Sequence, residues 1–339
     1  MNKKYLLGGV VAVLAILLFV SFVANNNSEN TNDVQGDSNQ EDETLTISAS
    51  FYPLAYFTER IVGDKATVIN IGEGLDPHDF TPSAKDITTL QSSDLVILLG
   101  AEFEPWGDSV VEQLNARQVP VLIATEHVKL LSLSEKDEHG HGEEAEHVEE
   151  TEHESEDAHE GEDEHGHGEF DPHVWLDPVL TQDIVKEIVE KLVAIDPGAA
   201  DTYEANGATL IAELKALDTS YSTRLSSCTV PEAIVSHDAF SYLSARYNLD
   251  MHPIAGISTQ DEPSAKVLAE LVEEAKEGIT TILTEESSVT EFADTLSRET
   301  GLALITINPI EYFVPAGEDY FSLMQTNLDA LTTAYGCSR

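Results

Sequence analysis

The sequence predicts an α/β fold of two domains, each built around a parallel sheet covered by helices. Short apolar runs of β character occur in two sets of four, and they alternate with stretches of helical character. This alternation is typical of parallel sheets with both faces covered, and its repetition indicates two domains with their own cores. The predicted strands are residues 45–49, 67–71, 94–99 and 119–124 in the first set, and 232–236, 250–254, 279–284 and 303–307 in the second.

The helices between the strands are predicted from the points at which they begin. Residues 83–91 carry a capping box that Asp86 completes, and such a box satisfies two backbone N–H groups at the start of a helix. In the second set, helices are expected to begin at Pro263, Val289 and Glu318.

One long helix is predicted between the two sets of strands. Residues 199–225 contain no proline, and apolar side chains recur in them at intervals of three and four. These side chains are Ile211, Leu214, Leu217 and Tyr221. We expect this helix, within residues 197–227, to join an N-terminal domain at 44–196 to a C-terminal domain at 228–339.

The N-terminus predicts export. Lys3 and Lys4 precede a nearly uninterrupted apolar run that is about long enough to span a bilayer. No cysteine follows this run, which argues against the usual lipoprotein attachment, and no A-x-A cleavage site is convincing. Residues 1–24 are therefore predicted to be an uncleaved membrane anchor, with a cleaved signal peptide as the alternative. Residues 25–43 are then a flexible linker, and the folded part lies outside the cytoplasm.

The chain is strongly acidic, with a formal net charge of −46 and 17 Lys and Arg residues in total. Nucleic acid is excluded as a partner, because its phosphate backbone is bound through Lys and Arg. A surface of this charge instead concentrates cations around the protein.

A loop rich in histidine and glutamate interrupts the predicted N-terminal domain at residues 135–169. It contains too few aliphatic residues to offset its ordering entropy, so we expect it to be disordered. Imidazole and carboxylate groups together suit zinc, and the loop is interpreted as a set of weak auxiliary metal sites. A solvated charge run without a role is the alternative. The histidines of the loop are His139, His141, His147, His153, His159, His165 and His167.

Cys228 and Cys337 are the only cysteines of the chain. In an exported protein, a pair of cysteines favours a disulfide. Zinc ligation by the pair is the alternative, although no C-x-x-C spacing supports it.

Candidate metal ligands follow three of the predicted strands. His78 lies just past the second strand, His237 directly follows the fifth, and Glu311 lies just past the eighth. Ligands of open parallel sheets bind outside the carboxyl ends of the strands, so these side chains share the expected edge. His173 joins them from the C-terminal end of the acidic loop. Three imidazoles and one carboxylate form a closed tetrahedral set that suits Zn²⁺.

Each of these residues also has an ordinary interpretation. A histidine beside a proline, such as His78, is often a turn residue, and Glu311 alone is an unremarkable acid. Trp175 is interpreted as a core or interdomain aromatic. His127 and His252 lie in no comparable motif and are interpreted as ordinary surface or partly buried histidines.

Several motifs occur in an order that resembles a known family. They are ASFYPLAYFTERIVGD, GLDPHDFTPSAKD, DPHVWLDP, SHDAFSYLSARYNL, GISTQDEPS and INPIE, and they span most of residues 45–335. The chain thereby resembles the cluster A-I solute-binding proteins of zinc and manganese ABC importers, specifically the zinc-uptake type. The resemblance implies two (β/α)4 domains joined by a long rigid helix, with the metal in the cleft between them.

The resemblance also implies a ligand set. His78, His173 and His237 match the positions of the family's zinc ligands. Manganese-binding relatives have Asp where this chain has Asn308, and Glu in place of the third histidine, so both differences favour zinc. Glu311 matches a position at which some zinc-binding relatives supply a carboxylate. Asn308 and a water molecule are the alternatives for the fourth ligand.

Together these inferences predict a binding protein and not an enzyme. We expect a monomer that binds Zn²⁺ as a transported substrate and delivers it to an ABC permease, which a cytoplasmic ATPase powers. A zinc hydrolase is disfavoured, because the chain contains no HExxH motif. A manganese-type binding protein and a zinc-buffering surface adhesin are the competing hypotheses.

Deletion of residues 136–168 is expected to remove several weak zinc sites and to leave the tight site nearly unchanged, because the loop lacks a fixed geometry. Titration of both forms with Zn²⁺ against a chelator checks this expectation. A large loss of affinity at the first equivalent would mean that a histidine of the loop is a true ligand.

Overall fold

The computed structural model describes residues 44–100, 103–133, 169–258, 261–285 and 290–338. The predicted membrane segment, the linker after it and the seven histidines of the acidic loop lie outside these residues. Within the described ranges, no helix is both long enough and apolar enough to cross a membrane.

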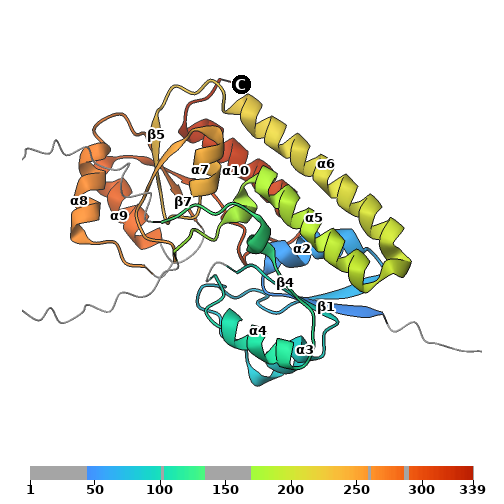
Figure 1. The fold of residues 1–339 in the computed structure, drawn as a ribbon. Helices are drawn as coiled ribbons and strands as arrows, with labels where there is room; N and C mark the ends of the chain where they lie inside the picture. The colour runs from blue at the N-terminus through green and yellow to red at the C-terminus, as the bar shows by residue number, and fades with distance from the viewer. Residues whose placement is uncertain (1–43, 101–102, 134–168, 259–260, 286–289, 339) are drawn as a thin grey trace, which may run out of the picture. The chain divides into compact units, whose positions relative to one another are not determined.

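Two four-stranded parallel sheets form the framework, so the predicted α/β fold is confirmed (Figure 1). The first sheet has the order β2-β1-β3-β4 and the second the order β6-β5-β7-β8. The strands of the first sheet are β1 (Leu45–Ala49), β2 (Ala66–Asn70), β3 (Leu95–Leu98) and β4 (Val121–Ile123). Those of the second are β5 (Glu232–Val235), β6 (Asp250–Pro253), β7 (Thr281–Thr284) and β8 (Ala303–Thr306).

Both sheets are wound in the same way. The first strand of each sheet, β1 or β5, lies in the middle of the sheet. The second strand pairs with one side of it and forms an edge, and the third strand pairs with its other side. The register in the first sheet places Ile47 of β1 beside Val68 of β2 and Leu95 of β3. Such a reversal leaves a crevice at the carboxyl ends of the two middle strands, which are β1 and β3 in one sheet and β5 and β7 in the other.

Some of the helices begin where a side chain satisfies their first backbone N–H groups. Ser83 caps α3 (Ala84–Gln91), and Asp86 completes the predicted capping box. A second capping box, formed by Asp319 and Ser322, begins α10 (Tyr320–Ala334). The remaining α-helices are α2 (Tyr52–Val62), α4 (Gly107–Ala116), α5 (Pro178–Ile195), α6 (Ala200–Arg224), α7 (Ser241–Tyr247), α8 (Ala265–Glu274) and α9 (Thr290–Thr300), and short 3-10 helices are η1 (Ala124–His127), η2 (Val174–Leu176) and η3 (Pro197–Ala199).

The predicted long helix is α6, which has 25 residues. It packs along α5 and also contacts α2 and α10 (Figure 1). At Gly207, an added Cβ would lie 2.4 Å from Cγ2 of Val189, so the close approach of α5 and α6 requires glycine. The Tyr221 hydroxyl donates a hydrogen bond of 2.6 Å to the Met324 carbonyl of α10. Helix α6 therefore ties together helices that belong to both sheets.

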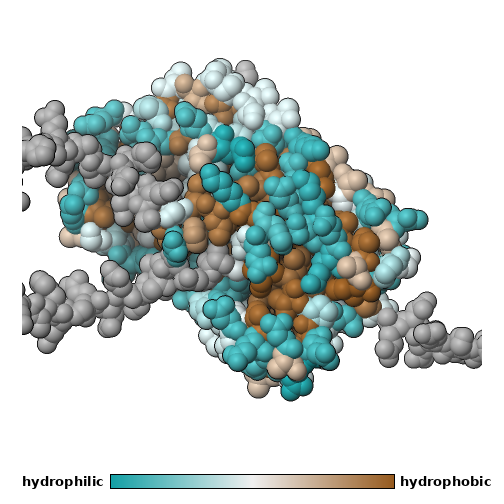
Figure 2. Space-filling view, viewed as in Figure 1, coloured by the Kyte–Doolittle hydropathy of each residue, from teal (hydrophilic) through white to brown (hydrophobic). Residues whose placement is uncertain are grey.

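The two sheets share their main core. One buried apolar cluster contains Ile47 and Ile97 of the first sheet together with Val235 and Leu283 of the second. Two smaller clusters each pack against a single sheet. On the face drawn in Figure 2, hydrophilic side chains lie over α5 and around α3 and α4.

Trp175 is a buried aromatic at the centre of this core, as predicted. Its ring packs edge-on against Phe51, with 4.8 Å between ring centroids. Its Nε1–H donates to the Pro309 carbonyl at 2.7 Å, and its own carbonyl accepts from the Tyr320 hydroxyl at 2.7 Å. A residue that lies just before α5 is thus bonded to the segment after β8 and to α10.

The two ends of the acidic loop are held together. Ser132 and Phe170 form an antiparallel bridge. The Leu133 N–H donates to the Glu169 carbonyl at 3.1 Å, and the Asp171 N–H donates to the Leu131 carbonyl at 2.9 Å. We call this pairing of residues 131–133 with residues 169–171 the neck of the loop.

Cys228 and Cys337 form the predicted disulfide, so zinc ligation by this pair is wrong. The two cysteines are 109 residues apart in sequence, and the loop that they close contains the whole second sheet. The bond therefore ties the segment before β5 to the segment after α10.

Replacement of both cysteines by serine is expected to lower the free energy of unfolding by about 2–5 kcal/mol, because a crosslink that closes a long loop restricts the unfolded chain. Denaturant unfolding of the double variant and of oxidised and reduced wild type checks this. Reduced wild type should match the double variant, whereas equal stability of all three forms would show that the crosslink does not stabilise the fold.

Candidate metal centre

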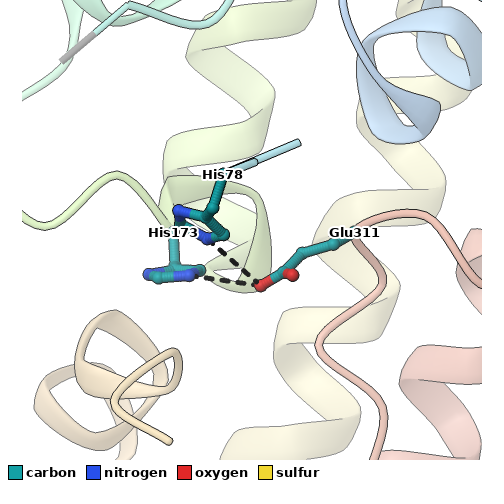
Figure 3. Close-up of side chains that lie close together, drawn as sticks. All are labelled: His78, His173 and Glu311. Carbon is teal, nitrogen blue, oxygen red and sulfur yellow. Dashed lines mark ion pairs between the residues drawn. The ribbon is translucent and has the colours of Figure 1, made fainter. Parts of the chain in front are cut away.

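The structure places the four predicted ligands near one another. Figure 3 draws three of them, His78, His173 and Glu311. His78 lies in the turn after β2, His173 directly precedes η2, His237 follows β5, and Glu311 lies in the turn after β8. Oε1 of Glu311 is 3.2 Å from Nε2 of His173, 3.5 Å from Nε2 of His237 and 3.9 Å from Nε2 of His78. One carboxylate oxygen thus faces three imidazole nitrogens.

These atoms are buried and lack hydrogen bonds. His173, His237 and Glu311 are at most 1% exposed, and the His78 side chain is 9% exposed. In the described part of the chain, the three Nε2 atoms and both Glu311 oxygens have no hydrogen-bond partner. Buried polar groups are normally satisfied, so this set of orphaned donors and acceptors points to an ion that binds between them.

The spacing of the atoms suits a small divalent metal. Tetrahedral bonds of about 2.1 Å place neighbouring ligand atoms roughly 3.4 Å apart. The distances from Glu311 to the three nitrogens bracket this value. The ligand atoms of His78, His173 and Glu311 also all lie within 4.8 Å of one another. His78, His173 and Glu311 can therefore hold a metal with small adjustments, and His237, which lies outside that set but near Glu311, would have to move closer to complete a four-ligand site.

The same tripeptide, Asp-Pro-His, positions two of the histidines. Oδ1 of Asp76 accepts a hydrogen bond from the His78 N–H at 3.0 Å, and Oδ1 of Asp171 accepts one from the His173 N–H at 2.9 Å. Such contacts between a side chain and the backbone two residues later fix a tight turn. The repetition was not predicted to matter, although residues 76–78 and 171–173 display it directly in the sequence.

Two further carboxylates hold the outer sides of the imidazole rings. Oδ1 of Asp171 lies 2.8 Å from Nδ1 of His173, and Oε1 of Glu285 contacts Nδ1 of His237. A carboxylate on one ring nitrogen holds the proton there and leaves the other nitrogen free to bind metal. Glu285 was not predicted from the sequence, but it directly follows β7 and could have been found by the same strand-end argument.

The surroundings of His173 and His237 favour the protonated imidazoles. Burial lowers the pKa of His237, but the charge of Glu285 and contact with Glu311 outweigh it and raise this pKa well above 6.5. For His173, contacts with Asp171 and Glu311 likewise outweigh burial and raise the pKa. Burial raises the pKa of Glu311, but its contacts with the three histidines dominate and lower this pKa well below 4.5. A metal must therefore displace protons from the imidazoles.

Asn308 shapes the turn that carries Glu311, and its side-chain oxygen is already used in a hydrogen bond within that turn. Its Oδ1 accepts from the Ile310 N–H at 2.6 Å, and its Nδ2 donates to the Phe313 carbonyl at 3.3 Å. Ile310 has φ = 58°, which is a strained conformation for a β-branched residue. The turn is thus held by hydrogen bonds against local strain, and it presents Glu311 to the site.

The other two described histidines lie outside this group. Nε2 of His127 is 3.6 Å from Glu187, and this His127 side chain is 51% exposed. His252 lies on β6 beside Glu232 and Asp250, and the ligand atoms of these three residues are within 4.8 Å of one another. The Asp250 side chain is 66% exposed, so this second group has the character of a solvated surface cluster.

Comparisons with known proteins give a family match over most of the chain. Residues 47–334 match the family model described as zinc-uptake complex component A, periplasmic. The chain is 36% identical over 300 residues to the zinc-binding lipoprotein AdcA of Streptococcus pneumoniae, and the match covers 86% of this chain but only 56% of that protein. It is 35% identical over 337 residues to the high-affinity zinc uptake system protein ZnuA of Bacillus subtilis, with 98% of each protein covered.

A solved structure extends this similarity to the fold. The crystal structure of the Zn(II)-bound ZnuA-like domain of Streptococcus pneumoniae AdcA matches with a TM-score of 0.69 at 33% identity. The match covers 86% of this chain and 99% of that domain.

The dissociation constant for Zn²⁺ is expected to rise as the pH falls, beginning above the ordinary imidazole pKa of about 6.5. The raised pKa values of His173 and His237 mean that protons compete with the metal at higher pH than they would on free imidazoles. Glu311 stays charged throughout this range because its pKa is lowered, so it adds no pH dependence. The measurement is the dissociation constant of protein lacking residues 136–168 between about pH 8.5 and 5.5 at fixed high salt. A profile that does not change with pH would contradict a site built on histidines.

Proposed function

This chain belongs to the family of periplasmic zinc-uptake complex component A proteins, and from that premise we propose that it captures one Zn²⁺ ion outside the cytoplasm and delivers it to a zinc importer of the ABC class. The observation that carries this proposal is that three buried imidazole nitrogens, which have no hydrogen bond, lie around the Glu311 carboxylate. In this assignment, His78, His173, His237 and Glu311 are the ligands of the transported ion.

The chemistry of the donors supports zinc over manganese. Imidazole nitrogen suits zinc, whereas manganese favours carboxylate, carbonyl and water oxygens. Three nitrogens and one oxygen form this site, and residue 308 is an asparagine whose amide is used in its own turn. The names of the relatives in Streptococcus pneumoniae and Bacillus subtilis, which refer to zinc, support the same choice.

A closed set of protein ligands suits capture better than catalysis. Catalytic zinc sites keep an open position for water or substrate. In this proposal four protein side chains hold the ion, and the family comprises solute-binding proteins. The protein is not an enzyme.

The fold supports entry and release of the ion past His78. His78 is the ligand whose side chain is partly exposed, whereas His173 and His237 are fully buried. The shared core and the contacts of α6 oppose a large hinge motion between the sheets. In this proposal, the turn at residues 72–80 moves to admit the ion, and the two sheets keep their places.

The permease and its ATPase are the partners, and the N-terminal segment keeps a monomeric protein at the membrane. The histidines of residues 135–169 raise the local concentration of metal near the neck, which leads directly to His173. Because the chain spans little more than half of AdcA, these partners are proposed for this chain on its own features.

Replacement of His173, His237 or Glu311 by alanine is expected to weaken Zn²⁺ binding by more than roughly 100-fold, because loss of a ligand should exceed the 10–100-fold cost of losing an outer partner. Competition titration of protein lacking residues 136–168 measures this. His127→Ala is the matched control, because this histidine lies on the surface away from the site. Zinc should also outcompete Mn²⁺ in the wild type. Ligand variants that bind Zn²⁺ like the control would exclude this site.

A further inference from the structure

We propose that Glu285 is a positioning residue that sets the preference of the site for zinc over manganese, acting through His237. This inference rests on the proposed function, because it concerns the selectivity of the same metal site. Glu285 is not one of the four candidate ligands. Its carboxylate contacts the outer nitrogen of His237, while the inner nitrogen of that ring faces Glu311 at 3.5 Å.

The backbone fixes this contact from two neighbouring strands. His237 follows β5 and Glu285 follows β7, and these strands are paired with Val235 beside Leu283. The ladder continues past the strand end, because the Ser236 N–H donates to the Leu283 carbonyl at 2.9 Å. The two side chains therefore extend from adjacent strand ends that cannot slide relative to each other.

The Glu285 carboxylate is itself held in place. It is 5% exposed, and its Oε1 accepts a hydrogen bond of 2.6 Å from the Ser236 hydroxyl as well as contacting Nδ1 of His237. With the proton of the His237 ring kept on Nδ1, the lone pair of Nε2 points toward Glu311 and the metal position. The ring then has one orientation available before any metal arrives.

This contact also changes how strongly the His237 ring binds a metal. A carboxylate on the outer nitrogen increases the basicity of the inner nitrogen and thus strengthens its bond to the metal. The gain is greater for zinc, which binds imidazole well, than for manganese, which prefers oxygen. Asp171 has the same relation to His173, so each half of the protein supplies one carboxylate of this kind. Glu285 is the simpler residue to test, because Asp171 also accepts from the His173 backbone.

The test is Glu285→Gln in protein lacking residues 136–168, with Zn²⁺ and Mn²⁺ affinities measured separately by competition with chelators. Glutamine keeps the size of the side chain and removes its charge. We expect the zinc dissociation constant to rise about 10–100-fold, and the manganese constant to rise by a clearly smaller factor, so that the preference for zinc falls. Thermal unfolding without metal should show that the variant is folded. With Co²⁺ bound in place of Zn²⁺, the visible absorption spectrum of the variant should differ from that of the wild type, because this spectrum reports the ligand field at the ion.

Glu274→Gln is the matched control. Oε2 of Glu274 lies 3.1 Å from Nδ1 of His252, so this variant loses a carboxylate at a histidine that is not in the site. It should leave both affinities unchanged. A Glu285→Gln variant that binds zinc like wild type, or that weakens both metals equally, would overturn this inference while wild-type zinc binding stands. Absence of tight zinc binding in the wild type would instead overturn the proposed function itself.

Discussion

The structure depends on the burial of a charged carboxylate among three imidazoles. Glu311 is buried. Removal of a charged carboxylate from water costs free energy unless an opposite charge or hydrogen bonds offset the lost hydration. Protons on His173 and His237 can compensate it in the metal-free protein, and a divalent ion can do so after their release. The surrounding fold has to keep water out and hold these groups close, whichever cation is present.

The shared core explains how the fold meets this requirement. Each sheet contributes residues to one buried cluster, and Trp175 bonds to the segments on either side of Glu311. The proposed ligands come from four separate turns, so none of them could be placed by local structure alone. Strain at Ile310 is tolerated because Asn308 and the burial of the isoleucine hold that turn. The energy of tertiary packing thus offsets the cost of placing a single carboxylate.

Much of this architecture could be predicted from the sequence. The eight strands appear as short apolar runs, and the start of α3 appears in a capping box, because both signals are local. The position of His237 relative to β5 followed from the same runs. Helix α5 was not predicted, although Asp177 and Pro178 mark its start, because the clearest run of periodic apolar residues lies in the longer α6. The expectation of separate cores also differs from the structure, since hydrophobic patterning shows which faces are apolar but not which faces meet.

The neck of the acidic loop, which includes the bridge between Ser132 and Phe170, fixes the backbone that leads into His173. Its hydrogen bonds join the two ends of the chain at Asp171, the first residue of the Asp-Pro-His turn, and so anchor this turn from the N-terminal side. Insertions are best tolerated where the flanking backbone is already anchored. A change in the length or composition of the segment between Ser132 and Phe170 is therefore compatible with an unchanged turn at His173.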